Sequence, residues 1–279
     1  MKSFFLVILL ALLSAFEIFS QRIVSLIPSA TYTLQQIEAD DLVVGRTSYC
    51  PPSINGKGIV VGDAINVSME TIVALRPTHV LASVFTKKAT TEKLQSMGIE
   101  VVCMPTPQNF VEICHQTIEL GKMAGKVTEA EKLIRVETAK VDSISQSTND
   151  RGLRAYVQVG AKPLWGATPD YYLSDMLSKI YLQNVLKDGE GACSREEITV
   201  RRPDIIIISS MGGLGRSEQK IWRKTSTALS MVIDESELSC TTPSHYRIAM
   251  QHIADFVRKN EKKMVGNADV DATTGATRR

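Results

Sequence analysis

Two patterns of apolar positions alternate along the chain. Short runs rich in β-branched residues are separated by stretches in which apolar residues recur every three or four positions. The first pattern predicts buried strands, the second predicts helices, and their alternation favours a parallel α/β architecture. The predicted strands are 23–26, 42–45, 59–61, 79–82, 100–103, 155–159, 205–209 and 231–233. The predicted helices are 31–37, 68–75, 90–97, 110–122, 171–180, 194–201, 219–224 and 246–260.

One helical pattern is much longer than the others. It follows Thr128 in the stretch TEAEKLIRVETAKVDSISQS and repeats its apolar residues at helical spacing: Ala130, Leu133, Ile134, Val141 and Ile144. Thr128 and Glu131 have the spacing of a capping box, and the polar stretch SQSTNDRG predicts the end of the helix. We therefore predict two α/β lobes joined by one long helix. The predicted boundaries are 1–20 for a leader, 21–125 and 149–263 for the lobes, 126–148 for the helix and 264–279 for a polar tail.

The two predicted lobes share an internal repeat. Residues 68–80 and 194–206 both follow S-x-E-x-I-x-x-x-R-P-x-x-[VI], at an offset of 126 residues. The matched pairs are Ser68 and Ser194, Glu70 and Glu196, Ile72 and Ile198, Arg76 and Arg202, and Pro77 and Pro203. Helix, proline and strand are a common local combination, but five matched positions at one offset indicate that the lobes are related halves.

Composition excludes several classes of function. The chain has 279 residues, of which 44% are hydrophobic and 22% charged, so it can bury a sizeable core. A net charge of +2 does not favour nucleic-acid binding. The sequence lacks the GxSxG, P-loop and HExxH motifs, and its glycine-rich MGGLG segment (211–215) does not follow a dinucleotide pattern, so an enzyme is not predicted.

The first twenty residues have the pattern of a secretory signal peptide. Lys2 precedes an unbroken apolar run, and small Ser20 offers a cleavage position. The run is short for a membrane span, although an uncleaved anchor is the alternative. Because no cysteine follows the run, a lipoprotein is not expected. Export permits disulfides among the five cysteines, but an odd number leaves one thiol unpaired, and burial as small apolar residues is the alternative.

Several segments resemble one known family. In the first half they are RIVSLIPSAT, VGRTSYCPP and VGDAINVSMETIVALRPTHVLAS, and in the second YVQVGAKPLWGAT, SREEITVRRPDIIIIS and SHYRIAMQHIADFV. They are similar to the helical-backbone substrate-binding proteins of ABC importers, which take up cobalamin, ferric siderophores or haem, with the cobalamin-binding members as the nearest likeness. The resemblance covers residues 22 to about 260. It implies two Rossmann-like α/β lobes bridged by a long helix, with a ligand cleft between them that closes only slightly.

The resemblance places the ligand at the strand ends. Ligands of open α/β sheets bind beyond the carboxyl ends of the strands, so we expect the turn at 29–31 to present N–H groups and hydroxyls to the cleft. The predicted ligand-binding residues are Ser29, Tyr49, Cys50, Ile65, Phe85, Lys162, Trp165, Met211, His245 and Tyr246. Aromatic rings can cover a macrocycle, and Lys162 or Arg46 can hold an anionic group. Trp165 in the core, and His245 as either an axial ligand or a solvated loop residue, are alternatives. A directly bound bare metal is not predicted, because the four histidines do not cluster with carboxylates along the sequence.

The resemblance also assigns a partner. In the family a surface Glu on each lobe pairs with Arg residues of a two-fold symmetric permease, and Glu70 and Glu196 fall on those positions. Two carboxylates at equivalent places suit a symmetric partner, whereas the alternative is that each complements its helix dipole. The resemblance implies a periplasmic monomer that needs no cofactor and binds no nucleic acid.

The tail contains a motif that the family does not explain. DATTGAT (271–277) resembles the site at which periplasmic flavin transferases attach FMN, which implies covalent FMN on Thr277. That motif normally lies in a folded flavin-binding domain, and the sequence shows none here. A disordered tail, or the remnant of a fusion, is the alternative. An exported, flavinylated electron-transfer protein is therefore the second candidate function.

Overall fold

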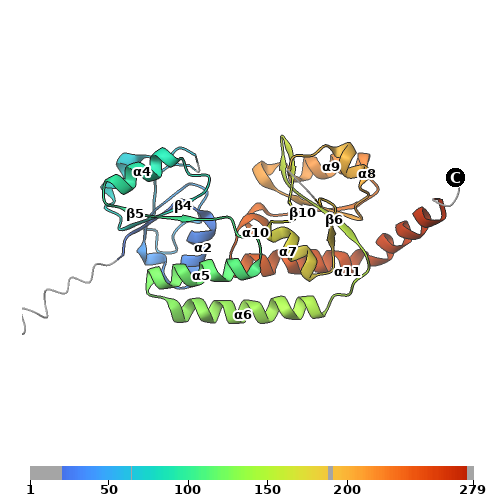
Figure 1. Cartoon of the computed structure of the whole chain (residues 1–279), viewed down its shortest axis with the longest axis horizontal. Helices are drawn as coiled ribbons and strands as arrows, with labels where there is room; N and C mark the ends of the chain where they lie inside the picture. The colour runs from blue at the N-terminus through green and yellow to red at the C-terminus, as the bar shows by residue number, and fades with distance from the viewer. Residues whose placement is uncertain (1–20, 64, 188–190, 275–279) are drawn as a thin grey trace, which may run out of the picture.

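The computed structural model describes residues 21–63, 65–187 and 191–274. Two α/β lobes lie side by side along one long helix, α6 (Val127–Gln146), which runs beneath both (Figure 1). The predicted leader at 1–20 lies outside the described residues. Among the helices that are described, none combines the length and the apolarity needed to cross a membrane. Two lobes with parallel sheets on a connecting helix confirm the predicted fold class.

The first lobe is a parallel sheet between two layers of helices. Its strand order is β3-β2-β1-β4-β5, and β1 and β4 are the most buried strands. The strands are β1 (Ile23–Ser25), β2 (Val43–Arg46), β3 (Ile59–Val60), β4 (His79–Ser83) and β5 (Glu100–Met104). Side chains alternate across the sheet: one face packs on α2 (Pro28–Gln36) and α5 (Phe110–Ala124), and the other on α3 (Met69–Ala74) and α4 (Lys88–Ser96). The short helix η1 (Asp40–Leu42) precedes β2.

The second lobe repeats this plan with one change. The strand order is β10-β9-β6, and both β7 and β8 pair with β6 on its other side. The strands are β6 (Arg154–Ala161), β7 (Leu164–Gly166), β8 (Gln183–Asn184), β9 (Ile205–Ser209) and β10 (Leu229–Ile233). Only β7 is antiparallel among these pairings. The helices are α7 (Tyr172–Lys179), α8 (Arg195–Val200), η2 (Met211–Gly213), α9 (Gly215–Thr225), α10 (Glu235–Ser239) and α11 (Pro243–Thr274). The pattern of the sequence did not predict β7, β8 and α10, which are two to five residues long.

The internal repeat has the same structure in both lobes. Helices α3 and α8 begin and end 126 residues apart, and so do strands β4 and β9. Ser68 caps α3 by accepting a hydrogen bond from the N–H of Thr71, and Ser194 caps α8 in the same way from Glu197. Arg76 and Arg202 leave the two helices with nearly identical positive φ angles of 47° and 46°. The isoleucine of each copy is fully buried. The relation between the halves is therefore structural as well as sequential.

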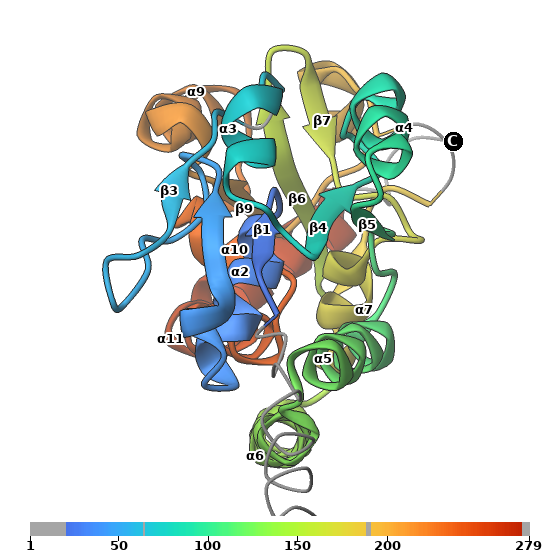
Figure 2. The same cartoon turned by 90° about the vertical axis from the view of Figure 1, so that its left-hand side faces the viewer.

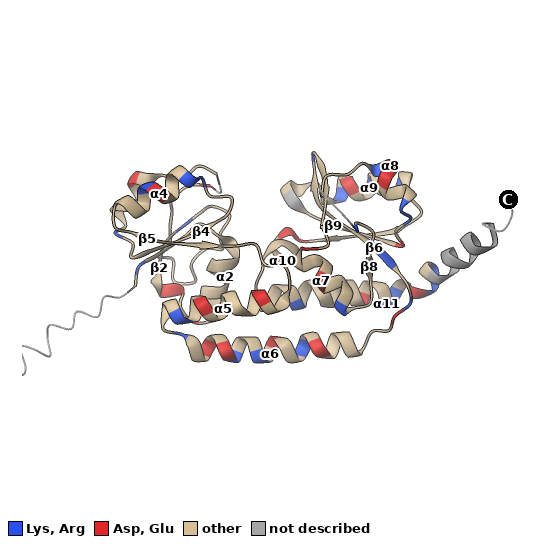
Figure 3. Ribbon diagram, in the orientation of Figure 1, with Lys and Arg blue, Asp and Glu red and all other residues tan. Residues whose placement is uncertain are grey.

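Helix α6 matches its predicted extent but not its predicted cap. The helix begins at Val127 after Lys126, and no side chain caps it. Gly125 ends α5 in the left-handed conformation (φ 66°), and α6 starts almost at once. Thr128 is therefore already inside the helix, so the predicted capping box with Glu131 is wrong. Acidic and basic side chains are interspersed along α6 (Figure 3).

Helix α5 belongs to both hydrophobic cores. Phe110 and Ile113, in its first turn, pack in the core of the second lobe with residues of β6, β9 and α11. Leu120, near its other end, packs in the core of the first lobe. The helix lies within the range predicted for the first lobe, yet it also joins the two lobes alongside α6.

Contacts between the helices beneath the sheets also join the lobes. The N–H of Phe110 and the hydroxyl of Tyr246 both donate to Oδ2 of Asp175, at 3.0 and 2.7 Å. The rings of Tyr32, on α2, and His245, on α11, meet edge to face with centroids 4.6 Å apart. Helices α2, α5, α7 and α11 are thereby held in one arrangement.

A buried carboxylate fixes α6 against α11. Glu137 is 5% exposed and accepts hydrogen bonds from Arg247 Nε and Lys140 Nζ, each at 2.8 Å. Burial alone would raise the pKa of Glu137, but the hydrogen bonds and charges of Arg247 and Lys140 outweigh it, so the pKa lies below its ordinary value of 4.5. The ion pair therefore contributes most when this carboxyl is ionised.

We expect Glu137→Gln to lower the free energy of unfolding by about 1–3 kcal/mol at pH 7, because the variant loses charge-assisted hydrogen bonds. The pKa of Glu137 is lower in the folded than in the unfolded chain. Its contribution is therefore complete above the ordinary value and is lost as the pH falls through the lower folded value. Denaturant unfolding between pH 7 and about pH 3 should show the difference from wild type shrinking. Glu131→Gln, on the exposed side of α6, is the control, and a difference that stays constant with pH would contradict the assignment.

Candidate functional site

A pocket opens between the two lobes. It has a volume of about 370 Å³ and is lined by both lobes. The first lobe contributes residues that follow β1, β4 and β5, and the second contributes Tyr171, Ser239 and Thr241. These segments of the first lobe follow the carboxyl ends of parallel strands, where α/β proteins place their ligands. We call this pocket the inter-lobe cleft.

Three of the predicted ligand residues line the inter-lobe cleft: Ser29, Ile65 and Phe85. Ile65 is 69% exposed and Phe85 is 83% exposed, so apolar surface faces the opening. The backbone N–H of Phe85 donates to the hydroxyl of Ser83 at 3.2 Å, which shapes the loop that carries the ring. An exposed aromatic ring held on a shaped loop is available for contact with a flat apolar ligand.

The turn after β1 is tighter than we predicted. Pro28 begins helix α2, so residues 29–31 are helical. Thr31 is fully buried and donates its hydroxyl to Ser25 at 2.8 Å, so it does not face the cleft. The structure instead brings the N-terminus of α2 to the cleft, where the first backbone N–H groups of a helix have no intrahelical acceptor.

A second pocket lies on the second lobe at the carboxyl ends of β6 and β9. Its volume is about 410 Å³, and Lys162 and Trp165 of the β6–β7 hairpin line it. In Figure 1 this hairpin stands on the side of the second lobe that faces the first lobe. Trp165 is 42% exposed, so it is a surface residue and the alternative of a core position is wrong. Met211 begins η2, which also borders this region, and its side chain lies outside the described part of the chain. We call this pocket the second-lobe pocket.

Its floor is a buried polar network. Gln158 accepts a hydrogen bond from the indole N–H of Trp222 at 2.6 Å and donates one to Glu218 at 2.8 Å. Arg195 forms an ion pair with Glu218 and lies 4.8 Å from the centre of the Trp222 ring. The four side chains hold one another in place, and Gln158 and Glu218 line the pocket.

The predictions for Tyr246 and His245 need correction. Both lie in the first turn of α11, and not in a loop. Tyr246 is 1% exposed, packs against Phe110 and is bound to Asp175, so it belongs to the core. His245 is half-buried between the lobes, where its Nδ1 is 2.8 Å from the hydroxyl of Thr242. Burial lowers the pKa of His245, which leaves a neutral ring that contacts Tyr32.

The predictions for Cys50 and Arg46 also need correction. Cys50 is 3% exposed and lies beneath β1, where its sulfur is 3.1 Å from the hydroxyl of Thr47. Arg46 donates hydrogen bonds to the backbone oxygens of Thr47 and Cys50, so its guanidinium group stabilises this turn. Tyr49, between them, is 66% exposed. All five cysteines are unpaired in the structure.

Several residues at these pockets were not predicted. In the inter-lobe cleft they are Gln116, Tyr171, Ser239 and Thr241, and in the second-lobe pocket Gln158, Ser209 and Glu218. Ser209 had a usable signal, because it stands 126 residues after Ser83, just beyond the two copies of the repeat. Glu218 and Gln116 lie inside helices and carry no comparable signal.

Glu70 and Glu196 occupy equivalent exposed positions. Each is the second residue of its short helix, α3 or α8, and stands two positions after the serine that caps the helix. Helix α8 lies on the face opposite α6 in Figure 1, and α3 does so in Figure 2. The two helices that carry Glu70 and Glu196 therefore lie on the same face of the molecule, one on each lobe.

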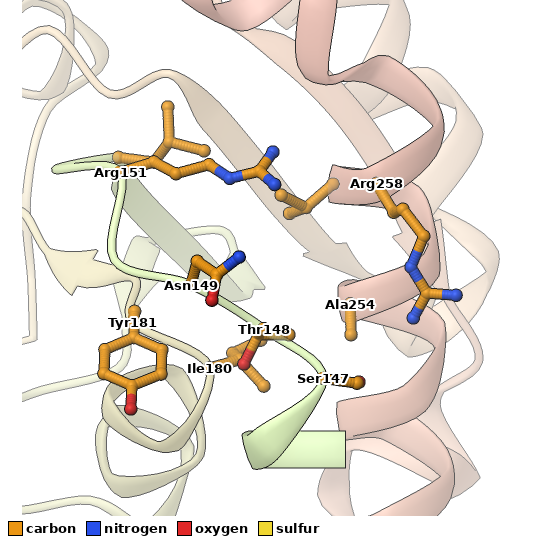
Figure 4. Close-up of a pocket in the computed structure, with 10 residues that line it drawn as sticks. Ser147, Thr148, Asn149, Arg151, Ile180, Tyr181, Ala254 and Arg258 are labelled. Atoms are coloured by element: carbon orange, nitrogen blue, oxygen red, sulfur yellow. The ribbon is translucent and has the colours of Figure 1, made fainter. Parts of the chain in front are cut away.

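Another small pocket lies away from the cleft. It is formed by the segment after α6, the turn at Ile180–Tyr181 and α11, and Figure 4 shows Arg151 and Arg258 at its edges. Its volume of about 40 Å³ has room for a few water molecules, not for a chelate. Within the described ranges, histidine, cysteine and carboxylate side chains do not gather in groups of three that could hold a metal.

Comparisons with known proteins agree with this geometry. An ABC transporter substrate-binding lipoprotein of Bacillus subtilis (strain 168), YvrC, named as uncharacterized, is 27% identical over 198 residues, which are 67% of this chain and 63% of that protein. The chain thus spans less than two thirds of the length of that relative. The vitamin B12-binding protein of Pectobacterium carotovorum subsp. carotovorum (strain PC1) is 24% identical over 83% of this chain and 86% of that protein.

The fold is also found among solved structures. The periplasmic haem-binding protein HutB of Vibrio cholerae superposes with a TM-score of 0.73 at 17% identity, over 85% of this chain and 99% of that one. The sequence profile of the periplasmic binding protein family matches residues 23–238, which include both sheets and the connecting helix. The chain therefore belongs to the periplasmic binding protein family.

Proposed function

We propose that this protein is an exported, monomeric binding protein that captures a corrinoid or an iron chelate and delivers it to the permease of an ABC importer. The observation that carries the proposal is an inter-lobe cleft with apolar surface at its opening, between two related lobes. Relatives and neighbours of the same fold are named for binding vitamin B12 or haem. The function is binding and release, with no catalytic step.

The exposed apolar residues support a large, flat ligand. In the first lobe Ile65 and Phe85 line the cleft, and Tyr49 and Val84 are exposed on neighbouring strand-end loops. Trp165 and Leu214, which line the second-lobe pocket, are also exposed. Soluble proteins rarely leave such surface open without a binding role. Contacts from two sides would cover both faces of a macrocycle, as ligand pockets typically bury most of their ligand.

The arrangement of the lobes supports a largely preformed site. Helices α5 and α6 join the lobes, and the contacts of Asp175 and Glu137 fix the helices beneath them. A ligand that enters such a cleft does not need to organise it first, which reduces the entropic cost of binding.

We expect Phe85→Ala and Trp165→Ala each to weaken binding of the preferred chelate by about tenfold or more, because each ring buries apolar area worth about 1.5–3 kcal/mol. Calorimetric titration of residues 21–279 with cobalamin, haem and ferric siderophores identifies the ligand. Ile54→Ala removes another exposed apolar side chain, one that does not line either pocket, and it should bind like wild type. Wild-type protein that binds none of these compounds would contradict the proposed function.

We further propose that Glu70 and Glu196 dock the protein on a permease dimer. Their equivalent positions on related lobes suit a partner with two-fold symmetry. Exposed charges of this kind mainly guide association and register, so they act on delivery and not on ligand capture.

The double variant Glu70→Ala and Glu196→Ala should bind its ligand with unchanged affinity but lower ligand uptake by cells about tenfold or more, as two docking charges are lost. Either single variant should have an intermediate effect. Glu131→Ala, on the opposite face, is the matched control. Uptake that is normal in the double variant, with normal amounts of exported protein, would refute the docking role.

Export itself is part of the proposal. Residues 1–20 would act as a signal peptide cleaved near Ser20, and lipid attachment is not proposed because Cys50 is the first cysteine. The second candidate function rests on the motif DATTGAT, whose Thr277 lies outside the described residues. An exported protein with FMN on Thr277 could pass electrons to a bound ferric or cobalt complex.

Protein produced with a periplasmic flavin transferase should be yellow and carry the added mass of FMN if this second function is correct. Thr277→Val should be colourless, because the attachment requires a hydroxyl, while the neighbouring Thr273→Val should remain yellow. A colourless preparation of the intact chain from such a host would eliminate the flavin function without affecting the binding function.

A further inference from the structure

The second-lobe pocket contains a buried hydroxyl without a protein partner. Ser209, the last residue of β9, is 6% exposed and lines the pocket, and its Oγ makes no hydrogen bond within the described part of the chain. Its counterpart in the first lobe, Ser83, accepts a hydrogen bond from the N–H of Phe85. The first lobe therefore uses this serine to hold its own loop, whereas the hydroxyl of Ser209 is buried at the wall of the pocket with no partner among the described residues. A buried polar atom of this kind needs a partner.

A carboxylate lines the same pocket. Glu218 is 6% exposed, and its Oε2 accepts hydrogen bonds from Gln158 and Arg195. Both ends of the Gln158 amide are occupied, one by Glu218 and the other by Trp222. The carboxylate is thus held in place with its charge balanced by Arg195, and it can still accept a hydrogen bond from a ligand because a carboxylate has about four acceptor sites.

We propose that the second-lobe pocket binds a neutral primary-amide arm of the ligand. The amide N–H groups would donate to Glu218, and the amide oxygen would accept from the hydroxyl of Ser209. Val159, Leu214 and the ring of Trp165 would enclose the chain that carries the arm. This inference rests on the proposed function and narrows it. Corrinoids carry primary amides on the ring edge, whereas haem carries carboxylates, so the pocket selects a corrinoid.

A carboxylate arm fits the floor of the pocket poorly. A carboxylate arm has no proton to donate to the carboxylate of Glu218, whereas an amide N–H can donate to it, and the charge of Glu218 is already balanced by Arg195. Lys162 is the cation at the rim, but it is exposed, and ion pairs of exposed lysines contribute little. The buried groups therefore determine the preference, and the rim does not reverse it.

The test compares cobalamin with its derivatives in which one edge amide is hydrolysed to a carboxylic acid, by calorimetric titration of residues 21–279. At least one acid isomer should bind about tenfold more weakly than cobalamin. Glu218→Gln should reduce that ratio, because an amide at this position can donate a hydrogen bond to the acid. Ser209→Ala should weaken cobalamin binding by about fivefold, the loss of one hydrogen bond.

Ser230→Ala is the matched control for Ser209→Ala. Ser230 lies on the neighbouring strand β10, is 9% exposed and also has a hydroxyl without a partner among the described residues, but it does not line the pocket. If Glu218→Gln fails to fold, the comparison of cobalamin binding by Ser209→Ala and Ser230→Ala tests the inference by itself. Three outcomes would overturn this inference and leave the proposed function standing. They are equal affinities for cobalamin and every acid isomer, equal effects of the two serine variants, and binding of haem in place of cobalamin. Failure of every chelate to bind would overturn the proposed function itself.

Discussion

The carboxylate of Asp175 is the contact on which the geometry of the cleft depends. It accepts hydrogen bonds from the first N–H of α5 and from the hydroxyl of Tyr246 on α11, and it belongs to α7. Burial, and then the nearby charge of Asp175, raise the pKa of Tyr246, so the phenol remains a proton donor. Three helices beneath the lobes therefore meet at one acceptor. Because these helices pack under both sheets, they connect the two walls of the inter-lobe cleft.

The lobes are related in plan but differ in the walls that they present. The first lobe offers the apolar surface of Ile65 and Phe85, and the second offers a pocket with a polar floor. The difference arises where β7 folds back antiparallel against β6, which has no equivalent in the first lobe. Walls of unlike chemistry allow a ligand with one polar edge to bind in a single orientation. Glu70 and Glu196 keep equivalent positions in the two lobes, whereas the walls of the lobes differ.

Much of the fold could be predicted from the sequence, because strands and helices with regular periods leave a clear pattern. The repeat indicated the relation between the lobes, and Ser29, Ile65, Phe85, Lys162 and Trp165 line pockets, although two separate pockets take the place of the single cleft that the sequence predicted. Tyr246 shows where this reasoning fails. An aromatic residue next to a strand-end loop has the same local sequence whether it faces a cleft or the core, and only the contact with Asp175, 71 positions away, distinguishes the two. Glu218 was missed for the related reason that its pocket is assembled from distant elements.

Helix α5 has a consequence for how the molecule unfolds. Its first turn completes the core of the second lobe and its later turns complete the core of the first. If either lobe opened fully, it would expose apolar side chains on a helix that the other lobe still needs, so the opening of one destabilises the other. The two lobes therefore behave as a single cooperative unit, in which neither half can be lost by local unfolding while the other persists. That coupling limits the exposure of cleavable segments to rare global events.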